Sequence, residues 1–196
     1  MSIVFRLFPN LIRGVFHLGA HTCEELADYV KQDLNVVWVE GNSKLIPLLK
    51  SITGSYPKHR VIEALVWERD NVQMNLNITN GNAQSSSVLP LKVHKKLYPG
   101  TIYVDKVSAL TKTVPTLYRE YDLNPHDYNL LCMDLQGIEL YVLRGSLELL
   151  DSFDVIHTEV SAVELYETNT KFNELTAFLN THGFKLVYHI LTSDGS

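Results

Sequence analysis

Short apolar runs alternate along this chain with segments in which apolar residues recur at helical spacing. The runs predict buried strands, and the segments between them predict helices. The predicted strands are 15–18, 36–39, 61–67, 128–133, 155–160 and 184–190. The predicted helices are 26–30, 45–52, 115–121, 138–150 and 172–179. This alternation indicates an α/β fold: a doubly wound, mostly parallel sheet with helices on both faces.

Local signals refine the ends of these helices. Thr22 and Glu25 have the spacing of a capping box at the start of the first helix. Thr170 is placed to cap the last helix, and Gly183 to end it. Gly145 predicts a break within the helix at 138–150.

Residues 72–100 interrupt the regular alternation. Residues 72–78 alternate between apolar and polar, which indicates an added strand with one solvated face. The stretch 80–100 has Gly, Asn, Ser and Pro at its ends and is predicted to be a loop, with His94, Lys95 and Lys96 on a solvated face. The chain has no long linker and no repeat, so residues 1–196 are expected to form a single domain.

Charge and composition narrow the classes of partner. Lys and Arg total 17 against 22 Asp and Glu, a net charge of -5, and no basic block is present to bind a nucleic acid. Cys23 and Cys132 lie far apart in apolar surroundings, as reduced thiols do. Arg6 and Arg13 interrupt the apolar stretch 1–18, so we expect neither a signal peptide nor a membrane span there. We expect a cytoplasmic protein without membrane contact.

The ends of the first two strands carry the residues expected of a nucleoside site. Gly19, Ala20 and His21 occupy the position of a nucleotide loop, and Glu40 follows where a carboxylate binds ribose hydroxyls. NAD is disfavoured because Glu24 places a negative charge where a pyrophosphate would rest on the helix N-terminus. S-adenosylmethionine has no phosphate and fits this loop better.

Four segments in order extend this interpretation. They are VFHLGAHTCEE at 15–25, VWVEGN at 37–42, NGNAQSSS at 80–87 and MDLQGIE at 133–139. Together they resemble the FkbM family of methyltransferases, over about residues 14–184. The resemblance implies the class I methyltransferase fold and S-adenosylmethionine as cofactor. It also implies methyl transfer to oxygen, often on sugars or hydroxylated natural products.

The resemblance implies roles for particular residues. Gly19, Ala20 and His21 would line the methionine end of the cofactor, Glu40 would bind the ribose, and Asp134 would lie beside the transferable methyl group. We expect further cofactor contacts from Gly41, Asn42, Ala64 and Ser86.

The chain also departs from the family pattern. His17 stands where the family often has Asp, Cys23 where it has Gly, and Cys132 where it has Lys. The sequence ends at Ser196, before the seventh, antiparallel strand of this fold, so that strand is either absent or truncated. Cys132 and the missing strand favour an alternative function, a non-catalytic methyltransferase-fold module that binds or assembles with a partner.

Methyl transfer to a hydroxyl needs a base, and two carboxylates are candidates. Asp134 ends the fourth core strand, and Glu159 lies at the end of the fifth. His157 shares a strand face with Glu159 and is interpreted as a core histidine. Mg²⁺ bound by Asp134 with Glu139 or Glu159 stays possible, but no metal ligand is predicted. The acceptor is expected to be a small molecule or carbohydrate, and the sequence leaves its identity and the oligomeric state open.

Overall fold

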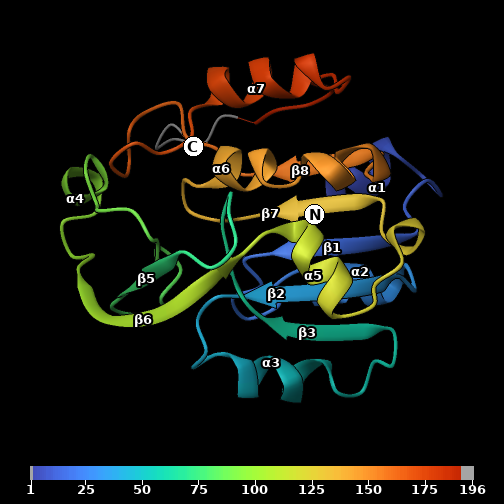
Figure 1. Ribbon diagram of the computed structural model, residues 1–196, viewed down its shortest axis with the longest axis horizontal. Helices are drawn as coiled ribbons and strands as arrows, with labels where there is room; N and C mark the ends of the chain where they lie inside the picture. Colours follow the sequence, from blue (N-terminus) through green and yellow to red (C-terminus); the bar gives the residue numbers. More distant parts are fainter. Residues whose placement is uncertain (1, 191–196) are drawn as a thin grey trace.

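The computed structural model describes residues 2–190, and a five-stranded parallel sheet lies at its centre (Figure 1). The strand order is β3-β2-β1-β7-β8, and every neighbouring pair is parallel. The strands are β1 Gly14–Leu18, β2 Asn35–Glu40, β3 His59–Glu63, β7 Leu130–Met133 and β8 Val155–Thr158. The predicted α/β fold with a mostly parallel sheet is confirmed.

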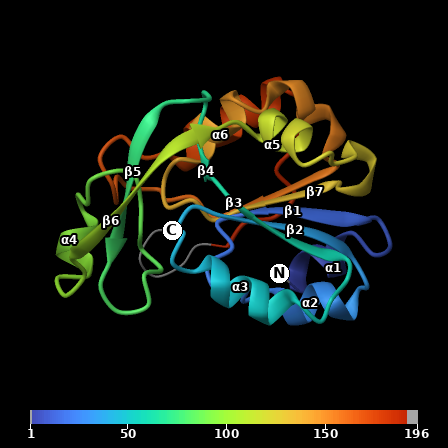
Figure 2. The ribbon, with the colours of Figure 1, turned by 60° about the horizontal axis from the view of Figure 1, so that its bottom comes forward.

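Helices cover both faces of this sheet (Figure 2). One face carries α1 Ser2–Leu7, α2 Leu26–Lys31 and α3 Ile46–Thr53. The other carries α5 Val114–Glu120 and α6 Glu139–Arg144, with α7 Phe172–Thr181 packed against α6. Two short 3-10 helices are Pro125–Asp127 and Leu147–Ser152. No helix within residues 2–190 combines the length and hydropathy needed to cross a bilayer.

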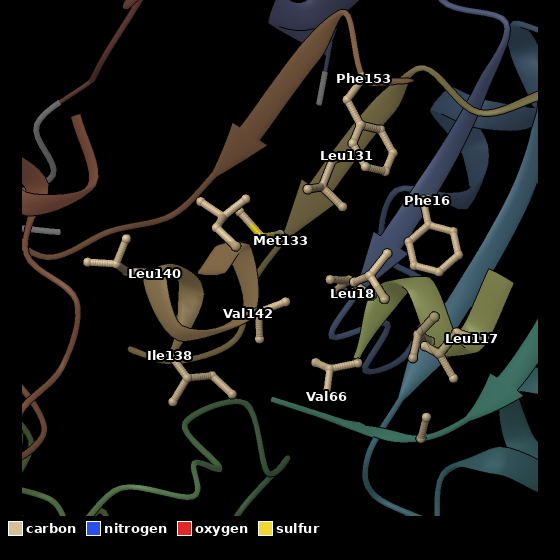
Figure 3. Close-up of a cluster of buried hydrophobic side chains, with 14 of the residues drawn as sticks. Phe16, Leu18, Val66, Leu117, Leu131, Met133, Ile138, Leu140, Val142 and Phe153 are labelled. Atoms are coloured by element: carbon tan, nitrogen blue, oxygen red, sulfur yellow. The ribbon is translucent and has the colours of Figure 1, made fainter. Parts of the chain in front are cut away.

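The largest cluster of buried apolar side chains lies between the sheet and the α5–α6 face (Figure 3). From the strands it takes Phe16, Leu18, Leu131 and Met133, and from the helices Leu117 and Val142. Successive side chains of a strand point to opposite faces, so β1 sends His17 to the other side of the sheet.

A small second sheet lies beyond the carboxyl ends of the main strands (Figure 1). Its order is β4-β6-β5, and its strands are β4 Leu65–Val66, β5 Gln73–Thr79 and β6 Tyr103–Lys112. The short helix α4 His94–Leu97 adjoins it. The strand predicted at 72–78 is confirmed as β5, whereas the strand predicted at 61–67 is divided at Ala64 between the two sheets. Strand β6 was not predicted, because apolar residues fall on both of its faces.

The strand predicted at 184–190 is wrong. These residues adopt no strand, and Val187 and Ile190 are 62% and 64% exposed. An apolar run becomes a strand only when its backbone groups pair with a neighbouring strand. Within residues 2–190, the main sheet ends at β8 and contains no antiparallel strand.

The capping box predicted from Thr22 and Glu25 is also wrong. Helix α2 begins only at Leu26, and Glu25 makes no side-chain cap. Cys23 has a φ of 58°, so the chain is still turning where the helix was expected. The Glu25 carboxylate instead lies 3.9 Å from Nε2 of His17.

At the other end of the chain, Thr170 does not cap α7. The N-cap is Lys171, whose N–H donates to Glu174 at 3.3 Å. The Thr170 hydroxyl accepts a hydrogen bond from the N–H of Leu140 at 3.0 Å, at the start of α6. The break predicted at Gly145 is confirmed, since α6 ends at Arg144.

Candidate active site

A pocket of about 460 Å³ lies where the parallel strands end, between the main sheet and the small sheet. All ten residues predicted to form the site line this pocket. They are Gly19, Ala20, His21, Glu40, Gly41, Asn42, Ala64, Ser86, Asp134 and Glu159. Nine of them come together because the carboxyl ends of parallel strands share one edge of a sheet, and Ser86 reaches the pocket from the loop after β5.

Glu40 holds the loops that follow β1 and β2. Its side chain is 8% exposed, and its two oxygens accept hydrogen bonds from the N–H groups of His21 at 2.8 Å and Asn42 at 2.6 Å. Burial raises the pKa of Glu40, and these hydrogen bonds partly oppose the rise. Each carboxylate oxygen has two lone pairs, so acceptor capacity is left for a ligand hydroxyl.

Gly19 brings the first loop against the end of β7. Its φ is +82°, and a Cβ atom there would lie 1.9 Å from the carbonyl oxygen of Asp134. The N–H groups of Gly19 and Ala20 both donate to the carbonyl of Val39, at 2.9 and 3.0 Å. The loop is therefore fixed between β2 and β7, and only glycine fits its first position.

The loop at 80–87 forms a wall of the pocket. Nε2–H of His21 donates to the carbonyl of Asn82 at 2.6 Å, and the Gln84 amide donates to Glu24 at 3.0 Å. The Ser87 hydroxyl donates to the carbonyl of Gln136 at 2.8 Å. These contacts tie the loop to the ends of both β1 and β7.

Asp134 follows β7 and faces the open pocket. Its Oδ1 accepts from the Gln136 amide at 2.6 Å, and Gln136 accepts from the Tyr166 hydroxyl at 2.7 Å. Desolvation by the surrounding protein raises the pKa of Asp134, and repulsion from Glu25 and Glu24 adds to the rise. Asp134 does not cap α6, whose N-cap is Ile138, so its carboxylate is available to the pocket.

Glu139 fixes the loop between β7 and α6. Its side chain is 1% exposed, and Oε1 accepts from the N–H groups of Leu135 and Gly137 at 3.1 and 3.2 Å. Its Oε2 has no hydrogen-bond partner. Burial raises the pKa of Glu139 to about 7.

A row of polar side chains crosses the sheet below the pocket. His17, Cys132 and His157 are register neighbours on β1, β7 and β8. The Cys132 sulfur lies 3.9 Å from Nε2 of His17 and 3.8 Å from Nδ1 of His157. Burial lowers the pKa of His17 to about 3 and also lowers that of His157, so both rings are neutral at pH 7.

His94 corrects a sequence interpretation. It was placed on a solvated face with Lys95 and Lys96, but it is 5% exposed and lines the pocket, while the two lysines are exposed. Its Nε2 is hydrogen-bonded to Ser85 at 3.2 Å, and its ring packs against Tyr166. No local pattern signals this burial, because it depends on contacts with distant segments. Gln136 at the pocket was missed for the same reason.

Metal binding has no support in the described part of the chain. Among residues 2–190, no three His, Cys, Asp or Glu side chains are arranged to hold a metal ion. Cys23 and Cys132 are both buried free thiols.

The sheet, its two helical layers and the pocket at the strand ends define a Rossmann-like α/β protein. Residues 19–186 match the model of the methyltransferase FkbM domain, so the chain belongs to the FkbM methyltransferase domain family. A crystal structure of methyltransferase FkbM from Methylobacillus flagellatus KT has the same fold, with a TM-score of 0.52 and 14% sequence identity. That match covers 86% of this chain and 36% of the other. The search of curated proteins gave no match.

The close approach at Gly19 can be tested against a matched glycine. Gly81 also has a positive φ, +70°, but a Cβ atom there meets nothing within 4 Å. Gly81→Ala is expected to lower the free energy of unfolding by about 1–2 kcal/mol, the cost of the left-handed backbone. Gly19→Ala adds the clash with Asp134, so its loss should exceed about 4 kcal/mol. Urea denaturation measures both, and equal losses would contradict the close approach.

Glu139 predicts a pH dependence of stability. Its pKa is raised from 4.5 to about 7 in the folded protein. Its contribution to the free energy of unfolding is therefore full below the pKa of the unfolded chain and is lost as the pH rises through the pKa of the folded protein. Between about pH 5 and about pH 8, the wild type should lose about 2–3 kcal/mol through this group. Glu139→Gln keeps the oxygen that accepts from the loop and should not show this loss. Urea unfolding at both pH values, with the exposed Glu148→Gln as control, decides whether Glu139 is responsible.

Proposed function

We propose that this domain binds S-adenosylmethionine and transfers its methyl group to a hydroxyl oxygen of a small or carbohydrate acceptor. One observation carries the proposal. In a chain of the FkbM methyltransferase domain family, Glu40 and Asp134 line one pocket, with the tight turn at Gly19 between them. This arrangement suits a nucleoside bound near Glu40 and a reacting centre near Asp134.

The adenosine half of the cofactor is assigned to the ends of β2 and β3. Glu40 would accept hydrogen bonds from the ribose hydroxyls with its remaining lone pairs. Gly41, Asn42 and Ala64 lie beside it on the pocket wall, and the buried Leu65 adds apolar surface for the base.

The methionine half is assigned to the loop after β1. His17 replaces the frequent Asp of the family, but it is 2% exposed and its Nδ1 is hydrogen-bonded to Tyr29 at 3.0 Å. It is therefore poorly placed to bind the cofactor ammonium. Glu24 and Glu25 also line the pocket and would supply the negative charge in its place.

For methyl transfer, the protein mainly has to align the methyl donor with the acceptor hydroxyl and to provide a base. When bound, S-adenosylmethionine would supply its methyl carbon to the acceptor oxygen, and the electron pair of the broken carbon–sulfur bond would stay on sulfur to give S-adenosylhomocysteine. The hydroxyl proton passes to Asp134 or Glu159. The raised pKa of Asp134 makes its carboxylate a stronger base than an ordinary aspartate.

Binding of the product tests the cofactor site. Calorimetric titration with S-adenosylhomocysteine should give a micromolar Kd for the wild type. Glu40→Ala should weaken it about 10- to 100-fold, because a hydrogen bond to a charged group contributes about 1.5–3 kcal/mol.

Glu63→Ala is the matched control for that titration, since Glu63 is the exposed register neighbour of Glu40 and does not line the pocket. NAD should not bind, because Glu24 faces the position of a pyrophosphate. No binding of S-adenosylhomocysteine by the folded wild type would contradict the proposal and favour a non-catalytic module of this fold.

Turnover tests the base. With S-adenosylmethionine and a panel of sugars and hydroxylated amines, Asp134→Asn should lower kcat for S-adenosylhomocysteine release by about 10²- to 10⁴-fold. Its affinity for S-adenosylhomocysteine should change much less. An unchanged kcat would exclude Asp134 as the base and leave Glu159, to be tested as Glu159→Gln.

A further inference from the structure

The carboxylate of Asp134 needs a contact outside the sheet to keep one orientation. Asp134 follows the last residue of β7, beyond the pairing of that strand with β1 and β8, and it is exposed to the pocket. An exposed side chain samples several rotamers, and fixing it costs conformational entropy. A contact that fixes the carboxylate before the acceptor binds therefore makes the reacting geometry easier to reach.

The Gln136 amide supplies such a contact. Its Nε2 donates to Oδ1 of Asp134 at 2.6 Å, and no hydrogen bond to Oδ2 is found among the described residues. On its other side, Oε1 of Gln136 accepts from the Tyr166 hydroxyl at 2.7 Å. The opposite orientation of the amide would place its oxygen against the ionised carboxylate, two acceptors without a hydrogen between them. The two contacts therefore fix the same orientation of the amide.

The backbone of Gln136 is held on both sides. The N–H groups of Leu135 and Gly137 donate to Oε1 of Glu139 at 3.1 and 3.2 Å. The carbonyl of Gln136 accepts from the Ser87 hydroxyl at 2.8 Å. Its φ of 52° is left-handed, a conformation that persists at a non-glycine residue where the surroundings determine it. The Gln136 side chain thus starts from a fixed point.

Tyr166 is a rigid anchor for the amide. Its side chain is 2% exposed, and its ring packs against that of His94 with 5.5 Å between the centroids. Gly137 allows the ring to come close, since a Cβ atom there would lie 3.4 Å from Cδ2 of Tyr166. The hydroxyl also lies 3.2 Å from the carbonyl oxygen of Ser85, so the shorter of its two contacts is the one to Gln136.

We propose that Gln136 and Tyr166 are positioning residues for Asp134 in methyl transfer. Tyr166 orients the Gln136 amide, and this amide holds Oδ1 of Asp134, which leaves Oδ2 to take the proton as the O–H bond of the acceptor breaks. The inference rests on the proposed methyltransferase function, and it assigns the base to Asp134 rather than to Glu159. Both residues act through Asp134 and need no contact with the acceptor.

The same contact affects the ionisation of Asp134. Burial raises the pKa of Asp134, and the hydrogen bond from Gln136 opposes the rise. Burial raises the pKa of Tyr166, so its hydroxyl is neutral at pH 7. The other titratable groups that act on Asp134 or share its cavities are His21, Glu24, Glu25, Cys132, Glu139 and Glu159. They stay unchanged in the variants below, so a difference in the pKa of Asp134 between variants reports the contact with Gln136.

The pKa of Asp134 tests the contact without any ligand. Protein with ¹³C-labelled aspartate carboxyls is titrated by NMR, and the Asp134 signal is identified by its loss in Asp134→Asn. Gln136→Met keeps the side-chain length and removes the donor without adding a charge. The pKa of Asp134 should rise by about one pH unit, a tenfold change in its dissociation constant, because a hydrogen bond to its charged form is lost.

Tyr166→Phe tests the outer contact. It should raise the pKa of Asp134 by about half a pH unit, since Gln136 can still donate but its amide is no longer oriented. Tyr103→Phe is the matched control, because the Tyr103 hydroxyl donates to the carbonyl of Leu89 at 2.6 Å and the residue lines neither cavity. That variant should leave the pKa of Asp134 at the wild-type value.

Turnover separates positioning from cofactor binding. With S-adenosylmethionine and the panel of sugars and hydroxylated amines, each protein is assayed about two pH units above its own measured pKa of Asp134, so that the carboxylate is ionised in all of them. Gln136→Met and Tyr166→Phe should lower kcat about 10- to 100-fold through lost orientation. The KM for S-adenosylmethionine and the Kd for S-adenosylhomocysteine should stay within about twofold of wild type.

The outcomes separate this inference from the proposed function. If S-adenosylhomocysteine does not bind to the folded wild type, the proposed function fails and the role in methyl transfer fails with it. If it binds but the pKa of Asp134 is the same in Gln136→Met as in the wild type, or kcat is unchanged in both variants, the positioning role is overturned and the proposed function stands. A raised pKa and a lowered kcat in both variants, with wild-type values in Tyr103→Phe, support the positioning role.

Discussion

The half of the pocket at the ends of β1 and β2 depends on two hydrogen bonds to one buried carboxylate, Glu40. Its oxygens accept the N–H groups of His21 and Asn42, which belong to loops on neighbouring strands. His21 has a left-handed φ of 43° and belongs to no helix or strand, and its N–H is satisfied by the Glu40 side chain. From this fixed backbone the His21 ring reaches Asn82 and draws the loop at 80–87 against the pocket. Glu40 thus positions the loops after β1 and β2 and, through His21, the loop at 80–87 that forms a wall of the pocket.

Glu139 repeats this arrangement at the end of β7, where it accepts the N–H groups of Leu135 and Gly137. The loop it holds also contains a left-handed residue, Gln136, with a φ of 52°. The two loops touch where Gly19 meets the carbonyl of Asp134. Two buried carboxylates therefore build the pocket from backbone turns that regular structure would leave unsatisfied. Both have a raised pKa because burial removes them from water.

The fold could be predicted from the sequence because it depends on local hydrophobic periodicity. Most residues that line the pocket could be predicted because the carboxyl ends of parallel strands lie at one edge of a sheet. Most of the predicted site residues lie at strand ends, Ser86 was predicted from the family resemblance, and the pocket contains them all. The failures depend on distant contacts. His94 is buried by Ser85 and Tyr166, and Thr170 is drawn to the start of α6 rather than to its own helix. The residues next to His94 and Thr170 in the sequence give no signal of these contacts. The apolar run at 184–190 has strand character but no partner strand within the described residues.

The carboxyl groups that line the pocket would also affect the proposed reaction through their charge. Five carboxyl side chains line it, and the described lining includes no Lys or Arg. Desolvation raises the pKa of Glu25 and Asp134, so the pocket is a poor environment for negative charge. In that reaction a sulfonium cofactor would bring one positive charge into this lining, and methyl transfer would remove that charge from sulfur as a carboxylate takes up the hydroxyl proton. The positive charge on sulfur and the negative charge on the carboxylate would be neutralised in one reaction, which is favoured more in a desolvated site than in water. The carboxylates whose negative charge is unfavourable in this pocket are thus the groups that would favour both cofactor binding and methyl transfer.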